Sequence, residues 1–172
     1  MGFKMERIMF DTSVYGKLVE DEEILNKVKE KYQNHEFIIY STIIIRKELR
    51  ATPKSVVHGI IKLRILLLNL YDSFITKDSQ NLKFNKLVEA LSSDYFSEYR
   101  KNKGSLSNET LRNDFVIAAT ATIYHLDVIV SDDEKTMLSE KAVNSYKSVN
   151  RKYGLKDPTF KKYSQFKKEL TR

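Results

Sequence analysis

The stretch that decides the fold is "DVIVSDDEKT", residues 127–136. Its apolar centre predicts a short buried strand, which ends in Ser131 and the adjacent carboxylates of Asp132 and Asp133. Neighbouring carboxylates repel each other, so a strand that serves stability alone rarely ends in two of them. The stretch by itself leaves two interpretations open, an ordinary polar loop or a site of chemistry.

Two further stretches have the same character. "RIMFD", residues 7–11, and "EFIIYS", residues 36–41, predict strands that end in Asp11 and Ser41. Strands that alternate with helical stretches predict a three-layer α/β/α sandwich with a central parallel sheet. In such sheets the functional crevice lies beyond the carboxyl ends of the strands, so the polar ends of all three strands are expected at one edge.

The helices follow from apolar spacing. After a polar turn, the first helix is expected over about 24–32, and "TIIIRKELRA" turns into a second one behind residue 41. Residues 55–71 and 84–99 carry apolar side chains at helical spacing, which predicts a helical insertion at about 55–100 between the sheet units. "SNETLRNDFVIAATATIYHL" begins at Ser107, a favourable N-cap, and predicts a helix to about residue 126.

Two of these helices carry an acid on the apolar stripe that should face the sheet. Glu48 lies four residues after Ile44, and Asp114 lies three residues after Leu111. Acids on a buried face are costly unless they are paired or bind a metal. With the acids at the strand ends, four carboxylates from distant positions are expected to converge. Oxygen ligands of this kind suit Mg²⁺ or Mn²⁺, and beside a basic surface they favour metal-assisted phosphodiester hydrolysis.

Each acid also has an ordinary structural interpretation. Asp11 could cap the helix that follows it, Glu48 could pair with Arg7 or Arg46, and Asp114 could pair with Arg112 or accept a backbone amide. Only the convergence of the set favours a functional site.

The chain of 172 residues is long enough for one domain with a substantial core. It has no cysteine, which excludes disulfides, thiolate zinc sites and cysteine nucleophiles. No secretory leader is visible, and the apolar stretches are too short or too interrupted to span a membrane. A soluble, cytoplasmic protein without membrane partners is therefore expected.

The net charge of +7 arises entirely in residues 147–172, where nine basic residues face two acids, and nine minus two is seven. This basic, aromatic C-terminal extension could follow a phosphate backbone, with Lys161, Lys162, Lys167 and Lys168 as candidate RNA contacts. The alternative is a solvated surface whose aromatic residues anchor it to the core.

Four pieces of the chain, in order, resemble a PIN-domain nuclease of the VapC-like ribonuclease type found in archaea and bacteria. They are "FDTSV" (10–14), "STIIIRKEL" (41–49), "NDFVIAATA" (113–121) and "VSDD" (130–133). The resemblance implies RNA cleavage by a metal-activated water, Mg²⁺ or Mn²⁺ as cofactor, frequent homodimers, and often the role of toxin beside an antitoxin protein.

Carried over by position, the resemblance implies the role of each residue at the expected edge. The catalytic, metal-binding acids would be Asp11, Glu48, Asp114 and Asp133, and the supporting hydroxyl groups those of Ser13, Ser41 and Ser131. Asp132 falls in the variable place and is the weaker candidate as a ligand.

Two other functions remain open. The first is a non-catalytic RNA-binding protein of the same fold in RNA processing, because a fold does not fix a function. The second is an aspartyl-phosphate phosphatase built on "FDTSV", which is disfavoured because Ser13 stands where that chemistry needs a second acid. His35, His58 and His125 have no metal-ligand or triad spacing and are interpreted as structural or surface residues.

Overall fold

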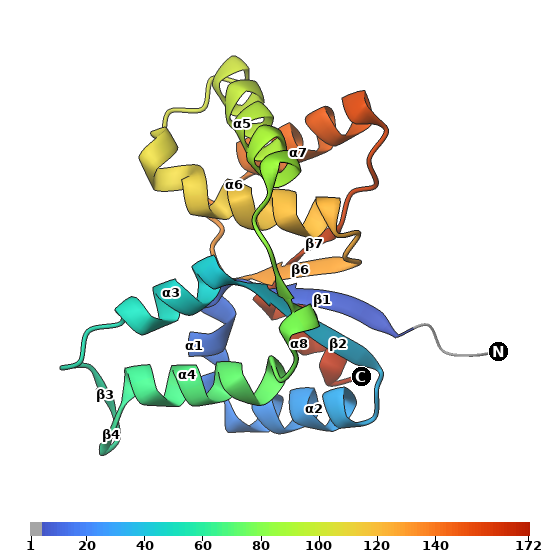
Figure 1. Cartoon of the computed structure of the whole chain (residues 1–172). Helices are drawn as coiled ribbons and strands as arrows, with labels where there is room; N and C mark the ends of the chain where they lie inside the picture. Colours follow the sequence, from blue (N-terminus) through green and yellow to red (C-terminus); the bar gives the residue numbers. More distant parts are fainter. Residues whose placement is uncertain (1–4) are drawn as a thin grey trace.

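The computed structural model describes residues 5–172 and confirms the expected α/β/α sandwich (Figure 1). Residues 1–4, which belong to the stretch where no leader is expected, lie outside this description. The sheet has five strands in the order β5-β2-β1-β6-β7, and every neighbouring pair is parallel. The strands are β1 (Glu6–Phe10), β2 (Phe37–Thr42), β5 (Asn81–Leu82), β6 (Val128–Ser131) and β7 (Thr159–Lys162).

Helices cover both faces of the sheet. One face carries α5 (Lys86–Lys101), α6 (Asn108–Ile123) and α7 (Glu140–Tyr153), which pack against one another above the sheet in Figure 1. The other face carries α1 (Thr12–Glu20), α2 (Glu22–Gln33), α3 (Ile43–Ala51), α4 (Leu63–Phe74) and α8 (Tyr163–Leu170). No helix within residues 5–172 is both long and apolar enough to cross a membrane.

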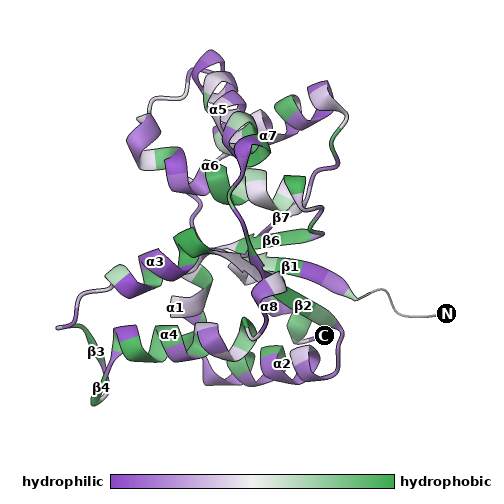
Figure 2. Cartoon of the chain, viewed as in Figure 1, coloured by the Kyte–Doolittle hydropathy of each residue, from purple (hydrophilic) through white to green (hydrophobic). Residues whose placement is uncertain are grey.

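The apolar spacing that predicts the helices also explains the core. In α6 almost every residue from Phe115 to Thr122 is buried, and three alanines let this helix approach the sheet closely. The central strands are the most apolar layer of the molecule, as Figure 2 shows for β2 and β6. All four residues of β6 are buried, which is typical of a strand covered on both faces.

Two local expectations are wrong. The turn expected after residue 11 is the helix α1, whose buried side chains Val14, Tyr15 and Leu18 share one face. The helix expected from residue 55 begins only at Leu63, because residues 57–62 form an antiparallel hairpin, β3 (Val57–His58) and β4 (Ile61–Lys62). Gly59, with a φ of 62°, makes its turn, and helical spacing alone did not reveal it.

The insertion at 55–100 is therefore not a simple helical pair. Besides α4 and α5 it contains this hairpin and the short strand β5, which pairs with the end of β2 and extends the sheet. Gln80 fixes the chain just before β5, because its side-chain amide donates to the carbonyl groups of Ile39 and Phe74 at 2.9 and 2.7 Å.

The basic C-terminal segment is part of the fold. Its strand β7 pairs with β6 along four residues, and its helix α8 places Phe166 against the rings of Phe10 and Phe37. Tyr163 and Phe166 are buried, so these aromatic residues anchor the segment to the core. The alternative of a folded-back structural segment is the one that the structure takes.

Candidate active site at the carboxyl edge of the sheet

Asp11 is the centre of the site. It follows β1 directly, stands at the N-cap of α1 without capping that helix through its side chain, and is 5% exposed. One carboxylate oxygen accepts hydrogen bonds from Ser131 Oγ at 2.7 Å and from Ser13 Oγ at 3.1 Å. Burial raises the pKa of Asp11, the hydrogen bonds oppose this, and the charge of Glu48 adds to it.

Ser13 and Ser131 tie the end of β1 to the end of β6. Ser13 Oγ accepts the backbone amide of Asp132 at 3.0 Å, and Ser131 Oγ accepts that of Asp133 at 3.0 Å. Because each hydroxyl group also donates to Asp11, the loop after β6 is held in a fixed position relative to this carboxylate. Both serines therefore connect the Asp11 carboxylate to the loop after β6.

The two adjacent acids after β6 point to different environments. Asp132 is exposed and forms an ion pair with Lys17, 3.4 Å between Nζ and Oδ2. Asp133 is partly buried; its Oδ1 accepts the amides of Lys135 and Thr136 at 2.9 Å, and its Oδ2 accepts Thr136 Oγ1 at 2.6 Å. The two acids of the doublet thus differ, with Asp132 at the surface and Asp133 on the inner side.

Asp114 shows most directly that the acids converge. It projects from α6 between the buried residues Leu111 and Phe115, and its pKa is raised to about 7. Burial is the main cause, the negative charges of Asp11, Asp133 and Glu48 add to it, and a hydrogen bond from Thr136 opposes it. Acids from two strand ends and from α3 therefore influence this one carboxyl group on α6.

Glu48 of α3 is held by hydrogen bonds from α1 and α6. One of its oxygens accepts the hydroxyl group of Thr12, and the other accepts Asn113 Nδ2 at 2.7 Å. Thr12 follows Asp11 on α1 and Asn113 precedes Asp114 on α6, so these two contacts attach the α3 carboxylate to the elements that carry the other acids.

The ion pairs considered for these acids are not formed within residues 5–172. Arg7 donates to the carbonyl of His125 and lies over the ring of Tyr40, while Arg46 pairs with Asp72 at 3.5 Å. Within residues 5–172, none of the four inner acids forms an ion pair with a lysine, arginine or histidine; these acids are Asp11, Glu48, Asp114 and Asp133.

The donor set suits a hard divalent cation. Four unpaired carboxylates, one of them with a pKa near neutrality, are stabilised by a positive charge, and oxygen is the ligand that Mg²⁺ and Mn²⁺ prefer. In the described part of the chain, however, no three acids or histidines are close enough together to hold an ion as they stand. Glu48 and Asp133 instead accept hydrogen bonds from neutral donors.

The remaining candidates lie elsewhere. Ser41 is fully buried and donates to the carbonyl of Thr42 rather than to an acid. Three of the four candidate lysines form ion pairs with acids outside the site: Lys161 with Glu169 at 2.6 Å, Lys162 with Glu134 at 2.9 Å and Lys167 with Asp21 at 2.5 Å. Lys168 is exposed on α8.

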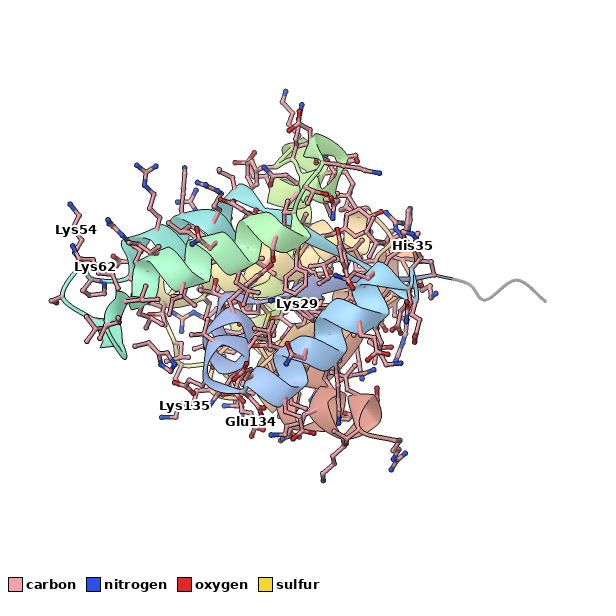
Figure 3. The ribbon with its side chains drawn as sticks, turned by 90° about the horizontal axis from the view of Figure 1, so that it is seen from below. Lys29, His35, Lys54, Lys62, Glu134 and Lys135 are labelled. Atoms are coloured by element: carbon pink, nitrogen blue, oxygen red, sulfur yellow. The ribbon has the colours of Figure 1, made fainter. Side chains whose placement is uncertain are left out.

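The histidines lie away from the acids or belong to turns. His35 precedes β2 and lies at the opposite end of the molecule from Glu134 and Lys135 of the loop after β6 (Figure 3). His35 and His125 both have a positive φ just beyond a helix, at 58° and 55°, where they close the helix end.

Sequence analysis missed three polar residues of the site, namely Thr12, Asn113 and Thr136. Thr12 and Asn113 each stand beside a predicted acid, and Thr136 stands three residues after Asp133, a spacing at which Asp commonly accepts a backbone amide. Their positions near the acids are the signal that marks them in the sequence. Thr12 and Asn113 donate to Glu48, which is distant in sequence, whereas Thr136 donates to Asp133.

Comparison with known proteins supports the fold. No protein-family model matches the chain, and no curated protein does. Among solved structures, FitAcB from Neisseria gonorrhoeae is 18% identical, with a TM-score of 0.58 over 90% of this chain and 96% of that one. DNA-bound VapBC from Salmonella typhimurium is 14% identical, with a TM-score of 0.55 over 92% and 98%. VapBC2 from Rickettsia felis, bound to a promoter DNA fragment, is 15% identical, with a TM-score of 0.54 over 91% and 98%.

These comparisons correct the identification as a PIN-domain nuclease of the VapC-like type. No family model supports it, and the structures that match are VapBC and FitAB complexes rather than a nuclease alone. A likeness at 14–18% identity shows a shared fold and nothing finer. The chain is accordingly not assigned to that family.

Proposed function

We propose that the protein is a metal-dependent nuclease that hydrolyses phosphodiester bonds of RNA at the site around Asp11. The observation that carries the proposal is the set of four inner acids without a cationic partner among residues 5–172. A cluster of this kind is destabilising unless a cation occupies it, so it is best explained by a function.

The residues would divide the work as follows. Asp11, Asp114 and Asp133 would hold Mg²⁺ or Mn²⁺, with Glu48 acting directly or through a water. The bound ion would lower the pKa of a water molecule and stabilise the negative charge that develops on the phosphate. Ser13 and Ser131 would keep the Asp11 oxygen oriented, and the raised pKa of Asp114 would make its proton leave near neutral pH.

Asp11→Asn tests the proposal. The substitution keeps the shape and the acceptor oxygen but removes the charge, so cleavage of a labelled single-stranded RNA in Mn²⁺ should fall by about a hundredfold or more. Asp132→Asn is the matched control, because Asp132 is exposed and pairs with Lys17. Equal cleavage by the wild type and Asp11→Asn would refute the assignment.

A second function is favoured by a different observation. The similar structures are named VapBC and FitAB, and several are bound to DNA, so the chain could instead be a non-catalytic, antitoxin-like partner of the VapB or FitA kind. Such a protein would bind a partner chain or promoter DNA and would cleave nothing with any metal. A non-catalytic RNA-binding protein would bind RNA without cleavage. Cleavage lost in Asp11→Asn with RNA binding retained excludes both.

The biological setting follows from the same comparison. A cytoplasmic toxin–antitoxin pair with a protein partner and a homodimeric arrangement is the setting we propose, and co-purification with the product of the adjacent gene tests it.

A further inference from the structure

A groove leaves the acid cluster between α3 and α6. It has a volume of 520 Å³, and its lining includes Ile43, Lys47, Glu48, Phe84, Arg112 and Asn113. Glu48 and Asn113, which are hydrogen-bonded to each other at 2.7 Å, belong both to this groove and to the acid cluster. We call it the α3–α6 groove.

A second hollow lies next to the groove. It has a volume of 190 Å³, lies between α5 and α6, shares Phe84 and Arg112 with the groove and extends to Ser92, Ser93 and Asn108. The aromatic ring and the arginine therefore line both hollows, and the first hollow also contains Glu48 of the acid cluster.

Phe84 is exposed on an anchored loop. Its side chain is 49% exposed, although it lies in the three-residue connection between β5 and α5. Tyr124 donates to the carbonyl of Lys83 at 2.9 Å, and Asn85 caps α5 by accepting the amide of Val88 at 3.0 Å. Because the residues on both sides are fixed, the ring is held at the surface without being part of the core.

The two hollows are lined by two cations, Lys47 and Arg112, and by two acids, Glu48 and Glu89. Lys47 and Arg112 are exposed, and neither has an ion-pair partner within residues 5–172. This distinguishes them from the lysines of the C-terminal segment, three of which are neutralised by acids. An exposed aromatic ring between free cations is the combination that binds a single strand, whose bases stack and whose phosphates pair.

We infer that the α3–α6 groove binds a single strand of nucleic acid, with one base stacked on Phe84 and the adjacent phosphates on Arg112 and Lys47. The strand would leave its next phosphodiester bond at the acid cluster. This inference rests on the proposed function for the identity of the site, but it concerns binding and is testable without cleavage.

The test measures binding of a fluorescein-labelled RNA single strand by anisotropy in EDTA, where no metal-dependent cleavage occurs. Phe84→Ala should weaken binding about tenfold, and Phe84→Trp should retain it. Arg112→Ala should reduce the slope of log affinity against log salt by about 0.7. The matched controls are Leu87→Ala, an exposed apolar residue three positions away, and Arg50→Ala on α3, neither of which lines the groove.

The outcomes separate the two proposals. If Phe84→Ala binds the RNA strand as tightly as the wild type does, the inference that the α3–α6 groove binds it is wrong, whatever the cleavage assay shows. Binding that depends on Phe84 and Arg112 in a protein that cleaves no RNA supports the groove and refutes the nuclease. A parallel DNA single strand shows whether the 2′-hydroxyl group is recognised, and preference for duplex DNA over both single strands overturns the inference.

Discussion

The acid edge of the sheet and the basic C-terminal segment carry opposite charges. They also differ in whether their charged groups have ion-pair partners. Three of the candidate lysines in the segment form ion pairs with acids, and its residues Tyr163 and Phe166 are buried in the core. At the acid edge the carboxylates are partly or fully buried and lack cationic partners within residues 5–172. An unbalanced charge therefore locates a functional site better than a high local density of charge does.

The largest expected effect is a loss of folding stability when the C-terminal segment is detached from the core. Phe166→Ala should lower the free energy of unfolding by about 3–4 kcal/mol, because it removes a buried ring that contacts Phe10 and Phe37. Urea unfolding followed by circular dichroism measures this. Tyr153→Ala is the control: that ring is 50% exposed, and its loss should cost less than about 1 kcal/mol. Equal effects would mean that the segment is only peripherally attached.

The second prediction distinguishes the roles of the adjacent acids Asp132 and Asp133. Asp133→Asn preserves an oxygen for the amides of Lys135 and Thr136 but removes the charge, and it should reduce RNA cleavage by about a hundredfold. Asp132→Asn should change cleavage less than about threefold, since it breaks only an exposed pair with Lys17. If Asp132→Asn reduced cleavage more than Asp133→Asn did, Asp132 rather than Asp133 would be the acid that acts in the site.

Much of the fold could be predicted from the sequence, because the spacing of apolar residues and the composition of a segment are local properties of the chain. The alternation of strands with helices predicted the parallel sheet, and the strand ends predicted the edge at which Asp11 and Ser131 lie together. The hairpin at 57–62 and the strands β5 and β7 were missed. Each strand is short, with two or four residues. The hairpin depends on the turn at Gly59, while β5 and β7 are formed through pairing with a distant strand rather than through their own apolar pattern.

The acids could be placed together from the sequence, but their surroundings could not. The positions of Asp11, Glu48 and Asp114 follow from strand ends and helix faces. That Glu48 contacts Thr12 and Asn113, rather than Arg7 or Arg46, depends on how α1, α3 and α6 meet at the edge of the sheet. No spacing within one helix contains that information.

The third prediction concerns Asp114 and pH. Its folded-state pKa is raised from 3.8 to about 7, so the folded protein binds a proton more tightly than the unfolded chain does. The stability of the metal-free protein should therefore fall as pH rises from about 4 to about 7 and then level off. Asp114→Asn should remove this loss and stabilise the protein by about 2 kcal/mol at pH 7, a figure reduced to allow for partial exposure.

Urea unfolding in EDTA at several pH values checks that prediction. The difference in the free energy of unfolding between Asp114→Asn and the wild type should decrease toward pH 4, because the wild-type carboxyl group becomes protonated and is then also neutral. If this difference were the same at pH 4 and pH 8, it would arise from packing rather than from charge.

The smallest effect is expected for the lysines of the C-terminal segment. The triple variant Lys162→Gln, Lys167→Gln and Lys168→Gln removes three exposed charges, two of which are in surface ion pairs worth about 0–1 kcal/mol each. If the segment bound the RNA backbone, the slope of log affinity against log salt would fall by about 2, at about 0.7 for each phosphate contact. We expect the slope to change by less than 0.7, which is about the change expected for Arg112→Ala alone. Anisotropy titrations of both variants over the same salt range decide whether the charge of the segment or the free cations of the α3–α6 groove bind the strand.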